Sequence, residues 1–171
     1  MIKNNLLLCF AMLFSTSSWA ENWYVDGGLG FVTFDDGVDE LSPTNIYIRG
    51  GYIINPNFNV GIEGSVTASP DQIPGVPVDF DVDIGTIYVR AGAPVSNAVR
   101  LYGQLGSSTT TLTGESGGVS VSTDDSDIMM GLGAEVDLGR GSTYLAINYS
   151  IYYDDEGVDV TGFNLGVGAR F

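Results

Sequence analysis

The stretch "TGFNLGVGARF", Thr161–Phe171, decides the fold because its apolar residues occupy every second position. Glycines and polar residues fill the positions between them. A period of two places successive side chains on opposite faces of a β-strand, whereas a helix repeats every 3.6 residues. The stretch is therefore predicted to be a strand with one apolar and one polar face. The apolar face carries Phe163, Leu165, Val167, Ala169 and Phe171.

The same alternation recurs upstream, and no stretch after residue 20 shows a convincing helical period. Eight strands are predicted, at Trp23–Phe34, Asn45–Ile54, Phe58–Thr67, Asp81–Ala93, Ala98–Leu112, Asp127–Val136, Thr143–Tyr153 and Val158–Phe171. The segment Asp81–Ala93 departs from the pattern, because its acids share a face with Ile87 and Val89. It either bulges near Gly85 or carries an acidic end that stands above a membrane.

The connections between these segments alternate in character. Short turns rich in Pro, Asn and Gly stand at Asn55–Asn57, Pro94–Asn97 and Asp137–Gly141. More polar and generally longer connections occupy residues 35–44, 68–80, 113–126 and 154–157. Short turns on one side and longer loops on the other, around an even number of strands, are typical of a transmembrane barrel. The predicted fold is all-β: an eight-stranded antiparallel up-and-down transmembrane β-barrel formed by residues 21–171.

Residues 1–20 are predicted to be a cleaved signal peptide. Lys3 precedes the apolar run Leu6–Phe14, and Ser18–Ala20 fits a secretory cleavage site. The run is about nine residues long, too short for a membrane helix of roughly 20. This leader contains the only cysteine, Cys9, so no disulfide or thiolate ligand is expected in the exported protein.

Charged residues on the polar faces predict which face points inward. They are Arg49, Glu63, Arg90, Arg100, Glu135 and Arg170. A soluble barrel or sandwich would expose these charges and bury the apolar faces, and alternation alone leaves that alternative open. Few charges of both signs among many glycines favour a narrow lumen with one network of paired charges near the short turns. Aromatic residues on the apolar face near that end are typical of an interfacial girdle: Trp23, Tyr52, Phe58 and Phe171.

Four motifs carry a resemblance to a known family. They are "GYIINPNFNVGIEG" (Gly51–Gly64), "VRLYGQLG" (Val99–Gly106), "GLGAEV" (Gly131–Val136) and "GVGARF" (Gly166–Phe171). With these motifs in this order, the chain resembles the small outer-membrane β-barrels of the OmpA/OmpX type, found in Gram-negative bacteria. The resemblance implies an integral outer-membrane protein with periplasmic termini, in contact with lipid and lipopolysaccharide. It also implies a lumen network that includes Glu63, Arg49 and Arg90, and recognition of Phe171 by the barrel-assembly machinery. A monomer is favoured.

Composition excludes several classes of function. The chain has no histidine, so the His-based acid–base pairs and triads of outer-membrane lipases and proteases cannot form. No dinucleotide, P-loop or zinc spacing is present. After loss of the leader, five arginines stand against 21 acids, and this net charge of −16 disfavours nucleic acid as a partner. No enzyme activity and no cofactor are expected.

Sixteen of the 21 acids fall in or beside the four longer connections, four in each region. Gathered at one mouth of a barrel, they would repel one another unless cations intervene. One interpretation is a rim that binds Ca²⁺ or Mg²⁺ through hard oxygen ligands. Its candidate residues are Asp79, Asp81, Asp83, Asp124, Asp125, Asp154 and Asp155. The other interpretation is an acidic crown that only solubilises the loops.

The sequence therefore predicts a non-enzymatic outer-membrane barrel with acidic extracellular loops. Its expected role is envelope integrity or surface interaction, including adhesion. The alternative is a narrow, cation-preferring, porin-like channel, because interior glycines leave room for water and an acidic mouth concentrates cations.

Overall fold

The computed structural model describes residues 22–73, 75, 77–139, 142–155 and 157–171 of the chain. The predicted signal peptide, residues 1–20, lies outside these residues. The strands are β1 (Trp23–Asp35), β2 (Glu40–Leu41), β3 (Thr44–Asn55), β4 (Phe58–Ser69), β5 (Asp79–Pro94), β6 (Val99–Ser116), β7 (Val119–Asp137), β8 (Thr143–Asp155) and β9 (Val158–Arg170). No helix in the described part of the chain is long and apolar enough to cross a membrane.

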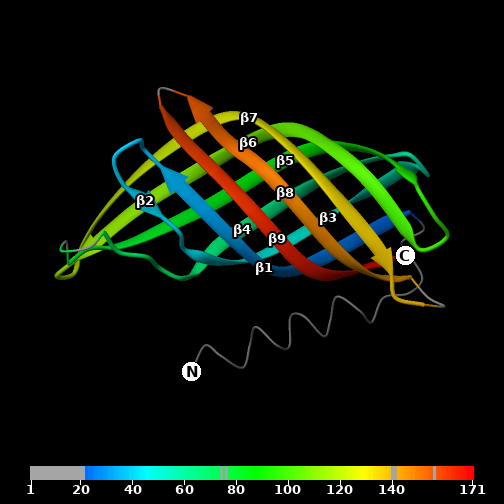
Figure 1. Ribbon diagram of the computed structural model, residues 1–171, viewed down its shortest axis with the longest axis horizontal. Helices are drawn as coiled ribbons and strands as arrows, with labels where there is room; N and C mark the ends of the chain where they lie inside the picture. Colours follow the sequence, from blue (N-terminus) through cyan, green and yellow to red (C-terminus); the bar gives the residue numbers. More distant parts are fainter. Residues whose placement is uncertain (1–21, 74, 76, 140–141, 156) are drawn as a thin grey trace.

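Eight long strands form one closed barrel (Figure 1). Neighbours pair in antiparallel fashion in the order β1-β3-β4-β5-β6-β7-β8-β9, and β9 returns to pair with β1. The two-residue strand β2 adds only to the outer end of β1, at Phe34 and Asp35. Closure pairs the backbone groups that an open sheet would leave free at its edges. The predicted all-β barrel of eight antiparallel strands is confirmed.

Side chains define the short turns at one end of the barrel. Asn55 Oδ1 accepts the backbone N–H groups of Asn57 and Phe58, at 2.9 and 3.0 Å, in the turn between β3 and β4. Ser96 Oγ accepts the N–H group of Ala98 at 3.2 Å in the turn between β5 and β6. Asn and Ser favour turns because their short side chains bond the backbone locally, which explains why these turns follow the predicted boundaries closely.

An apolar belt covers the outside of the barrel. Large apolar side chains on the long strands are more than a third exposed, including Leu29, Ile48, Ile62, Ile87, Leu105, Leu132, Tyr149 and Leu165. Inward side chains of the same strands are polar and buried, including Asn45, Arg49, Glu63, Arg90, Gln104 and Asn148. A soluble barrel has the reverse arrangement. The soluble alternative is therefore wrong, and the apolar face is the one that meets lipid.

The third longer connection differs from the prediction. A loop is expected at Thr113–Ser126, but β6 runs to Ser116 and β7 begins at Val119. Only Gly117 and Gly118 form the turn, with positive φ angles of 59° and 82°. Two consecutive residues with positive φ are typical of the type I′ turn, which matches the twist of a hairpin. Alternation failed to show these strand ends because both of their faces are rich in Ser, Thr and Asp.

Strand β5 resolves the two interpretations of its acidic half. Its ladder with β6 runs from Asp79–Glu115 to Pro94–Arg100 without a register shift, so no bulge occurs near Gly85. The strand is continuous, and its acidic end is an extension of the same ladder.

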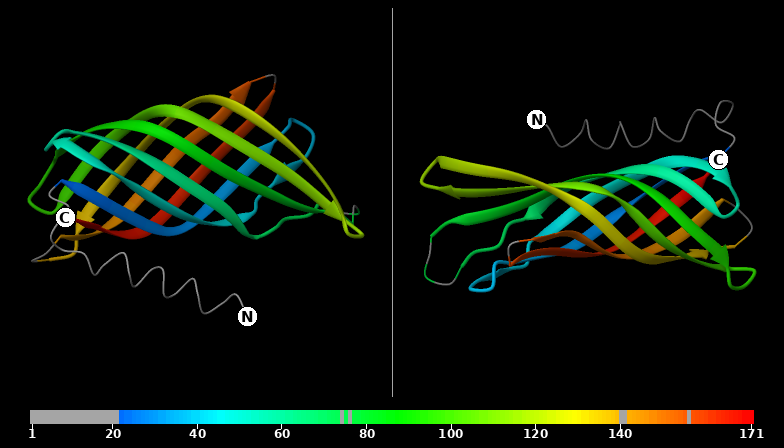
Figure 2. Two further views of the ribbon diagram at one scale, coloured as in Figure 1. Left: turned by 180° about the vertical axis from the view of Figure 1, so that it is seen from behind. Right: turned by 90° about the horizontal axis from the view of Figure 1, so that it is seen from above.

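From Gly85 toward Asp79, at the outer end of β5, the polar and apolar faces of the strand exchange places. Asp81 and Asp83 share the outer face, and Val82 and Ile84 are buried inside the barrel. The outer ends of β5, β6 and β7 project beyond the other strands (Figures 1 and 2). A polar outer face suits a sheet that stands in water, so this projection lies above the apolar belt. We call residues 79–84, 107–116 and 119–128 the projecting sheet.

Candidate functional site

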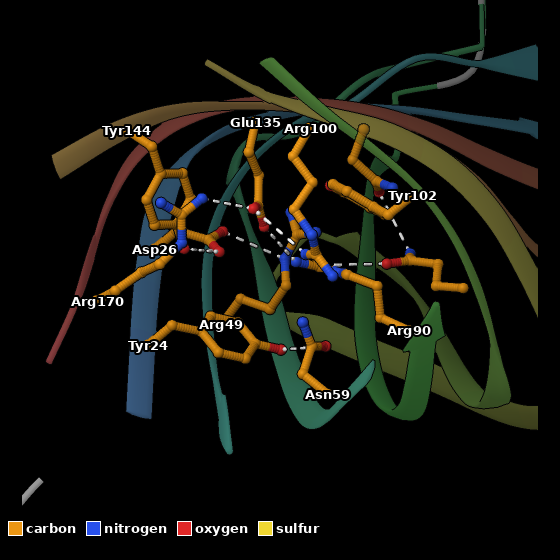
Figure 3. A network of polar contacts seen from close by, with 12 residues as sticks. Tyr24, Asp26, Arg49, Asn59, Arg90, Arg100, Tyr102, Glu135, Tyr144 and Arg170 are labelled. Atoms are coloured by element: carbon orange, nitrogen blue, oxygen red, sulfur yellow. Dashed lines mark hydrogen bonds and ion pairs between the residues drawn. The ribbon is translucent and has the colours of Figure 1, made fainter. Parts of the chain in front are cut away.

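Arg49 anchors the first of two ion-pair groups in the lumen (Figure 3). It lies directly opposite Asp26 in the β1–β3 ladder and opposite Glu63 in the β3–β4 ladder. Side chains so placed share one face, with Cβ atoms roughly 5 Å apart. Arg49 Nε is 3.3 Å from Asp26 Oδ1 and 3.1 Å from Glu63 Oε2, and all three side chains are at most 1% exposed. The strand register therefore creates this group.

Glu135 of β7 is the centre of the second group (Figure 3). Its carboxylate meets three guanidinium groups, those of Arg90 at 3.0 Å, Arg100 at 3.5 Å and Arg170 at 2.7 Å. Arg170 also reaches Asp137, at 2.8 Å between Nη1 and Oδ1. The Glu135 side chain is buried, so these partners take the place of water around its charge.

All six residues predicted for the lumen point into it, but their ion pairs form two groups and not one. Arg49 and Glu63 belong to the first group, and Arg90, Arg100, Glu135 and Arg170 belong to the second. Tyr144 joins the two groups. Its hydroxyl donates to Asp26 Oδ2 at 3.1 Å, and its ring centre lies 4.4 Å from the Arg170 guanidinium carbon.

Sequence reasoning missed two carboxylates of these groups, Asp26 and Asp137. The available signal for Asp26 was its parity, because it shares the polar face of its strand with Tyr24 and Gly28. The sequence predicts Asp137 in a turn, but it ends β7. With both included, four arginines face four carboxylates. This balance of charge is what a poorly hydrated interior requires.

Tyrosine rings cover the guanidinium group of Arg90. Its central carbon lies 3.9 Å from the ring centre of Tyr102, 5.2 Å from that of Tyr88 and 5.5 Å from that of Tyr24. Desolvated contacts of this kind are worth about 2 kcal/mol. The hydroxyl groups of Tyr24 and Tyr88 share a hydrogen bond of 2.8 Å. These tyrosines lie on the polar faces of the predicted strands, and no feature of the sequence distinguishes them from other polar-face residues.

Glycines on neighbouring strands make room for the rings. A Cβ atom on Gly133 would lie 2.3 Å from Tyr102 Cζ, and one on Gly168 would lie 2.4 Å from Tyr144 Cζ. Both distances are far shorter than real Cβ contacts, so each ring needs a glycine beside it. The channel interpretation requires water in the space beside interior glycines. At Gly133 and Gly168 this space is filled by the rings of Tyr102 and Tyr144.

A polar layer follows the tyrosines toward the projecting sheet. Gln104 Nε2 donates to Ser150 Oγ at 2.9 Å. Asn164 Nδ2 donates to the Tyr152 hydroxyl at 2.9 Å, and this hydroxyl donates to Glu63 Oε1 at 2.7 Å. These bonds connect the middle of the lumen to the first ion-pair group.

An apolar plug fills the lumen beyond the polar layer. We use this name for Val32, Val82, Ile84, Tyr88, Met129, Tyr152 and Val160, which are all buried and in contact with one another. Phe34, Leu112 and Tyr153 pack against the plug from the outer side. An apolar constriction resists wetting and the passage of ions. The lumen is thus filled by ion pairs with tyrosines, then by amides and hydroxyls, then by apolar side chains. Tyr88 and Tyr152 bridge these layers, because their rings belong to the plug while their hydroxyl groups bond Tyr24 and Glu63.

The acids considered for a cation rim are spread over three strands. Asp79, Asp81 and Asp83 lie on β5, Asp124 and Asp125 on β7, and Asp154 and Asp155 on β8. Asp83 accepts the backbone N–H group of Thr67 at 2.8 Å. Within the described ranges, no group of three or more His, Cys, Asp or Glu side chains could hold a metal ion together.

Two acids at the outer strand ends, Asp159 and the rim candidate Asp81, have raised pKa values, and both lie outside the apolar belt. Partial desolvation raises the pKa of Asp159, and the neighbouring carboxylates of Asp154 and Asp35 raise it further. Partial desolvation also raises the pKa of Asp81, with smaller contributions from acids on β5 and β6. Strands at this end of the barrel therefore carry charge repulsion at neutral pH.

The aromatic residues near the short turns all lie on the outside of the barrel. Trp23, Tyr52, Phe58 and Phe171 are exposed, and the rings of Trp23 and Tyr52 meet edge to face with centres 5.5 Å apart. The backbone of Phe171 is bonded on both sides, because its N–H group donates to Trp23 O and its oxygen accepts from Asn22 N–H, each at 2.8 Å. Its side chain faces outward at the edge of the belt.

A comparison with protein families finds a match that covers most of the chain. The model of the outer membrane protein beta-barrel domain matches residues 6–171. No curated protein sequence matches the chain.

Solved structures of bacterial barrels share the fold. Ail, the attachment invasion locus protein of Yersinia pestis, solved in complex with the heparin analogue sucrose octasulfate, has 19% identity and a TM-score of 0.68, over 88% of this chain and 99% of Ail. Neisserial surface protein A has 14% identity and a TM-score of 0.69, over 88% of this chain and 98% of its own. OprG from Pseudomonas aeruginosa has 14% identity and a TM-score of 0.63, over 89% and 96%. At these identities the likeness is one of fold.

Proposed function

Since this chain belongs to the outer membrane protein β-barrel domain family, we propose that it is a non-enzymatic surface-interaction protein of the Gram-negative outer membrane. The short turns and both termini face the periplasm in this proposal, and the projecting sheet faces the outside of the cell. The apolar belt contacts lipid and lipopolysaccharide. The working part of the molecule is the projecting sheet, which binds an extended, positively charged segment of a partner protein.

The observation that carries the proposal is the unpaired edge of β7. Its ladder with β8 begins only at Met130–Ile151, whereas its ladder with β6 continues to Val119. Within the described ranges, residues 119–129 of β7 thus have no ladder pairing with β8, and the Asp127 side chain near the inner end of this range accepts the Asp154 N–H group of β8. Free backbone N–H and C=O groups along such an edge are a template for an added strand.

Charge defines which segments fit this edge. The projecting sheet carries Asp79, Asp81, Asp83, Glu115, Asp124, Asp125 and Asp127. Every arginine in the described residues lies in the lumen near the short turns, engaged with carboxylates. The edge therefore attracts Lys- and Arg-bearing segments and repels polyanions, with a strength that falls as salt rises. The expected partner segment is positively charged, whereas sucrose octasulfate, the ligand in the Ail complex, is negatively charged.

The filled lumen supports a barrel that does not conduct. The apolar plug and the tyrosine layer occupy the positions that a water path would need. An acidic mouth alone is a weak argument for a channel when no polar path continues below it. We therefore retain surface interaction and not conduction as the proposed function.

Assembly through Phe171 remains a proposal that rests on the family resemblance. The exposed ring at the edge of the belt is placed where another protein can contact it. Phe171→Ala should lower insertion into the outer membrane in cells, while the yield of barrel refolded in detergent stays unchanged. An equal loss in both assays would make Phe171 a packing residue.

Binding of probe peptides to the protein in phosphatidylcholine nanodiscs tests the proposed function. An alternating Lys-Thr peptide should bind. The same peptide with proline at alternate positions should bind weakly, because proline cannot donate to a strand ladder. An alternating Glu-Thr peptide should not bind. Equal binding of the proline peptide would show that charge alone drives the interaction and that no strand is added. Tighter binding of the Glu-Thr peptide would contradict the proposal.

A trimmed variant locates the binding site. Replacement of residues 113–122 by Asn-Gly shortens the β6–β7 hairpin and removes one acid, Glu115. It should abolish most of the binding of the Lys-Thr peptide. Glu40→Gln, which removes one acid from another outer segment, is the matched control and should bind almost as well as the unaltered protein.

A further inference from the structure

A cavity of about 210 Å³ lies at the outer mouth of the barrel, beside the projecting sheet. Residues of β6 and β7 form one wall, and the outer ends of β1, β8 and β9 form the other. The two walls separate because the β7–β8 ladder stops at Met130. Beside the cavity, Asp127 Oδ2 accepts the Asp154 N–H group at 3.1 Å and ties β7 to the end of β8. The plug, through Val160, forms the floor.

Most of the cavity wall is apolar. Phe34, Leu112, Val158 and Val160 line it. Phe34 and Val160 are directly opposite in the β1–β9 ladder, and Leu112 faces them from β6. An apolar group that enters between these side chains is removed from water on both of its faces. This burial contributes a binding free energy of about 25 cal/mol for each Å² of apolar surface.

Two polar groups mark one side of the cavity. Thr110 and Asp125 are directly opposite each other in the β6–β7 ladder, and both line the cavity. Thr110 is 6% exposed, and its hydroxyl is a buried group for which the described residues provide no hydrogen-bond partner. Asp125 brings a carboxylate to the same side. A hydroxyl that accepts and a carboxylate that attracts positive charge together suit a donor group that carries a positive charge.

We propose that this cavity binds a small molecule made of an apolar body and a primary ammonium group. The ammonium group lies between Thr110 and Asp125, and the apolar body lies between Leu112 and the Phe34–Val160 pair. The cavity is smaller than the roughly 300–1,000 Å³ of sites for drug-sized ligands, so the ligand is of the size of a single ring with a short chain. The proposal does not depend on strand addition at β7.

The probe for a direct test is phenethylammonium. The protein is held in nanodiscs with methyl-labelled leucine and valine, and the methyl shifts of Leu112, Val158 and Val160 are followed by NMR during titration. Saturable shifts at these three residues are expected. Empty nanodiscs correct for partition of the amine into lipid. Two comparators separate the parts of the ligand: 3-phenylpropionate has the ring with the opposite charge, and ethylammonium has the charge without the ring. Both should bind at least tenfold more weakly.

Paired variants test the polar side of the cavity. Asp125→Asn should weaken phenethylammonium binding by about two- to fivefold, the range for a solvent-accessible ion pair. Asp124→Asn is the matched control, because Asp124 lies next to it on the other face of β7 and does not line the cavity. Thr110→Val, which keeps the shape and loses the hydroxyl, should also weaken binding. Equal effects of Asp125→Asn and Asp124→Asn would overturn the assignment of the ammonium group.

A filled cavity tests the apolar side. Leu112→Trp should abolish the saturable shifts of Val158 and Val160, while heat-modifiable mobility in gels confirms that the barrel is folded. Thr111→Trp places the same ring on the outer face of β6 and should leave binding intact. Unchanged binding in folded Leu112→Trp, or equal binding of 3-phenylpropionate, would overturn the proposal. If Lys-bearing peptides bind and phenethylammonium does not, the cavity is part of the strand-addition surface. That result would also overturn the small-molecule site.

Discussion

Arg170 and Glu135 form the shortest ion pair described in the lumen, 2.7 Å between Nη2 and Oε2, although their strands are not neighbours in the sheet. Arg170 belongs to β9 and Glu135 to β7, so the pair spans β8 across the inside of the barrel. Arg90 and Arg100 approach the same carboxylate from β5 and β6. One acid on one strand thus ties four strands together near the short turns.

Removal of this acid should destabilise the barrel strongly. Glu135→Gln leaves three arginines with a neutral partner, and the loss of one side of a buried pair costs about 3–5 kcal/mol. Urea unfolding of the barrel refolded in detergent, followed by tryptophan fluorescence, measures the change. Asp137→Asn is the control, because Asp137 is 38% exposed and its pair with Arg170 is worth about 1 kcal/mol or less. Similar losses for both variants would show that Glu135 is not the centre of the network.

The match between tyrosines and glycines gives a second prediction. Gly133→Val would place a Cβ atom 2.3 Å from Tyr102 Cζ and 2.6 Å from the Ile147 carbonyl oxygen, so β7 or the ring must move. We expect a loss of about 3 kcal/mol or failure to refold, the upper range for an overpacked interior. Gly64→Val is the matched control in β4, because no atom lies within 4 Å of its added Cβ. Heat-modifiable gel mobility reports refolding of both, and a well-folded Gly133→Val would argue against the layer of rings.

Charge repulsion at the outer strand ends gives a prediction for pH. A carboxyl group with a raised pKa in the folded protein contributes stability below its unfolded pKa, and this contribution is lost as pH rises through the folded pKa. Asp159 is such a group, so its contribution falls as pH rises above about 4. Asp159→Asn should therefore be more stable than the unaltered barrel at pH 7 and should show a flatter dependence between pH 4 and 7. A steeper dependence in the variant would contradict the assigned repulsion.

The plug predicts the electrical behaviour of the barrel. Refolded protein in planar bilayers should give no resolved conductance steps, because the buried side chains of Val82, Met129 and Val160 close the lumen. Stable steps with cation selectivity would restore the channel interpretation.

Much of the barrel could be predicted from the sequence because one face of each strand meets lipid. Alternation located all eight long strands, and the charges on polar faces indicated which side points inward. The pairing partners of those charges were not readable, because a register shift of one residue moves a side chain to the other face. Arg49 meets Asp26 and Glu63 only because the ladders β1–β3 and β3–β4 place all three at one level.

The acidic end of β5 above the belt was one of two sequence interpretations, but the rest of the projecting sheet was not predicted, for a different physical reason. Above the belt the solvent changes from lipid to water, so the same strand keeps its period but exchanges its faces. Val82 and Ile84 fall on the face that is polar lower in β5, and Ser and Thr cover both faces of β6 there. The plug and the mouth cavity depend on this exchange, so neither could be predicted before the register of β5 with β6 was known.

Amide hydrogen exchange of β7 tests the central claim, strand addition at its outer edge, most directly. The protein in nanodiscs is compared with and without the alternating Lys-Thr peptide. The account predicts that alternate amides within Val119–Ser126, those that point away from β6, become protected, while amides of Val99–Gly106 exchange as before. Bound peptide without protection along β7, or with protection only in other segments, would contradict it.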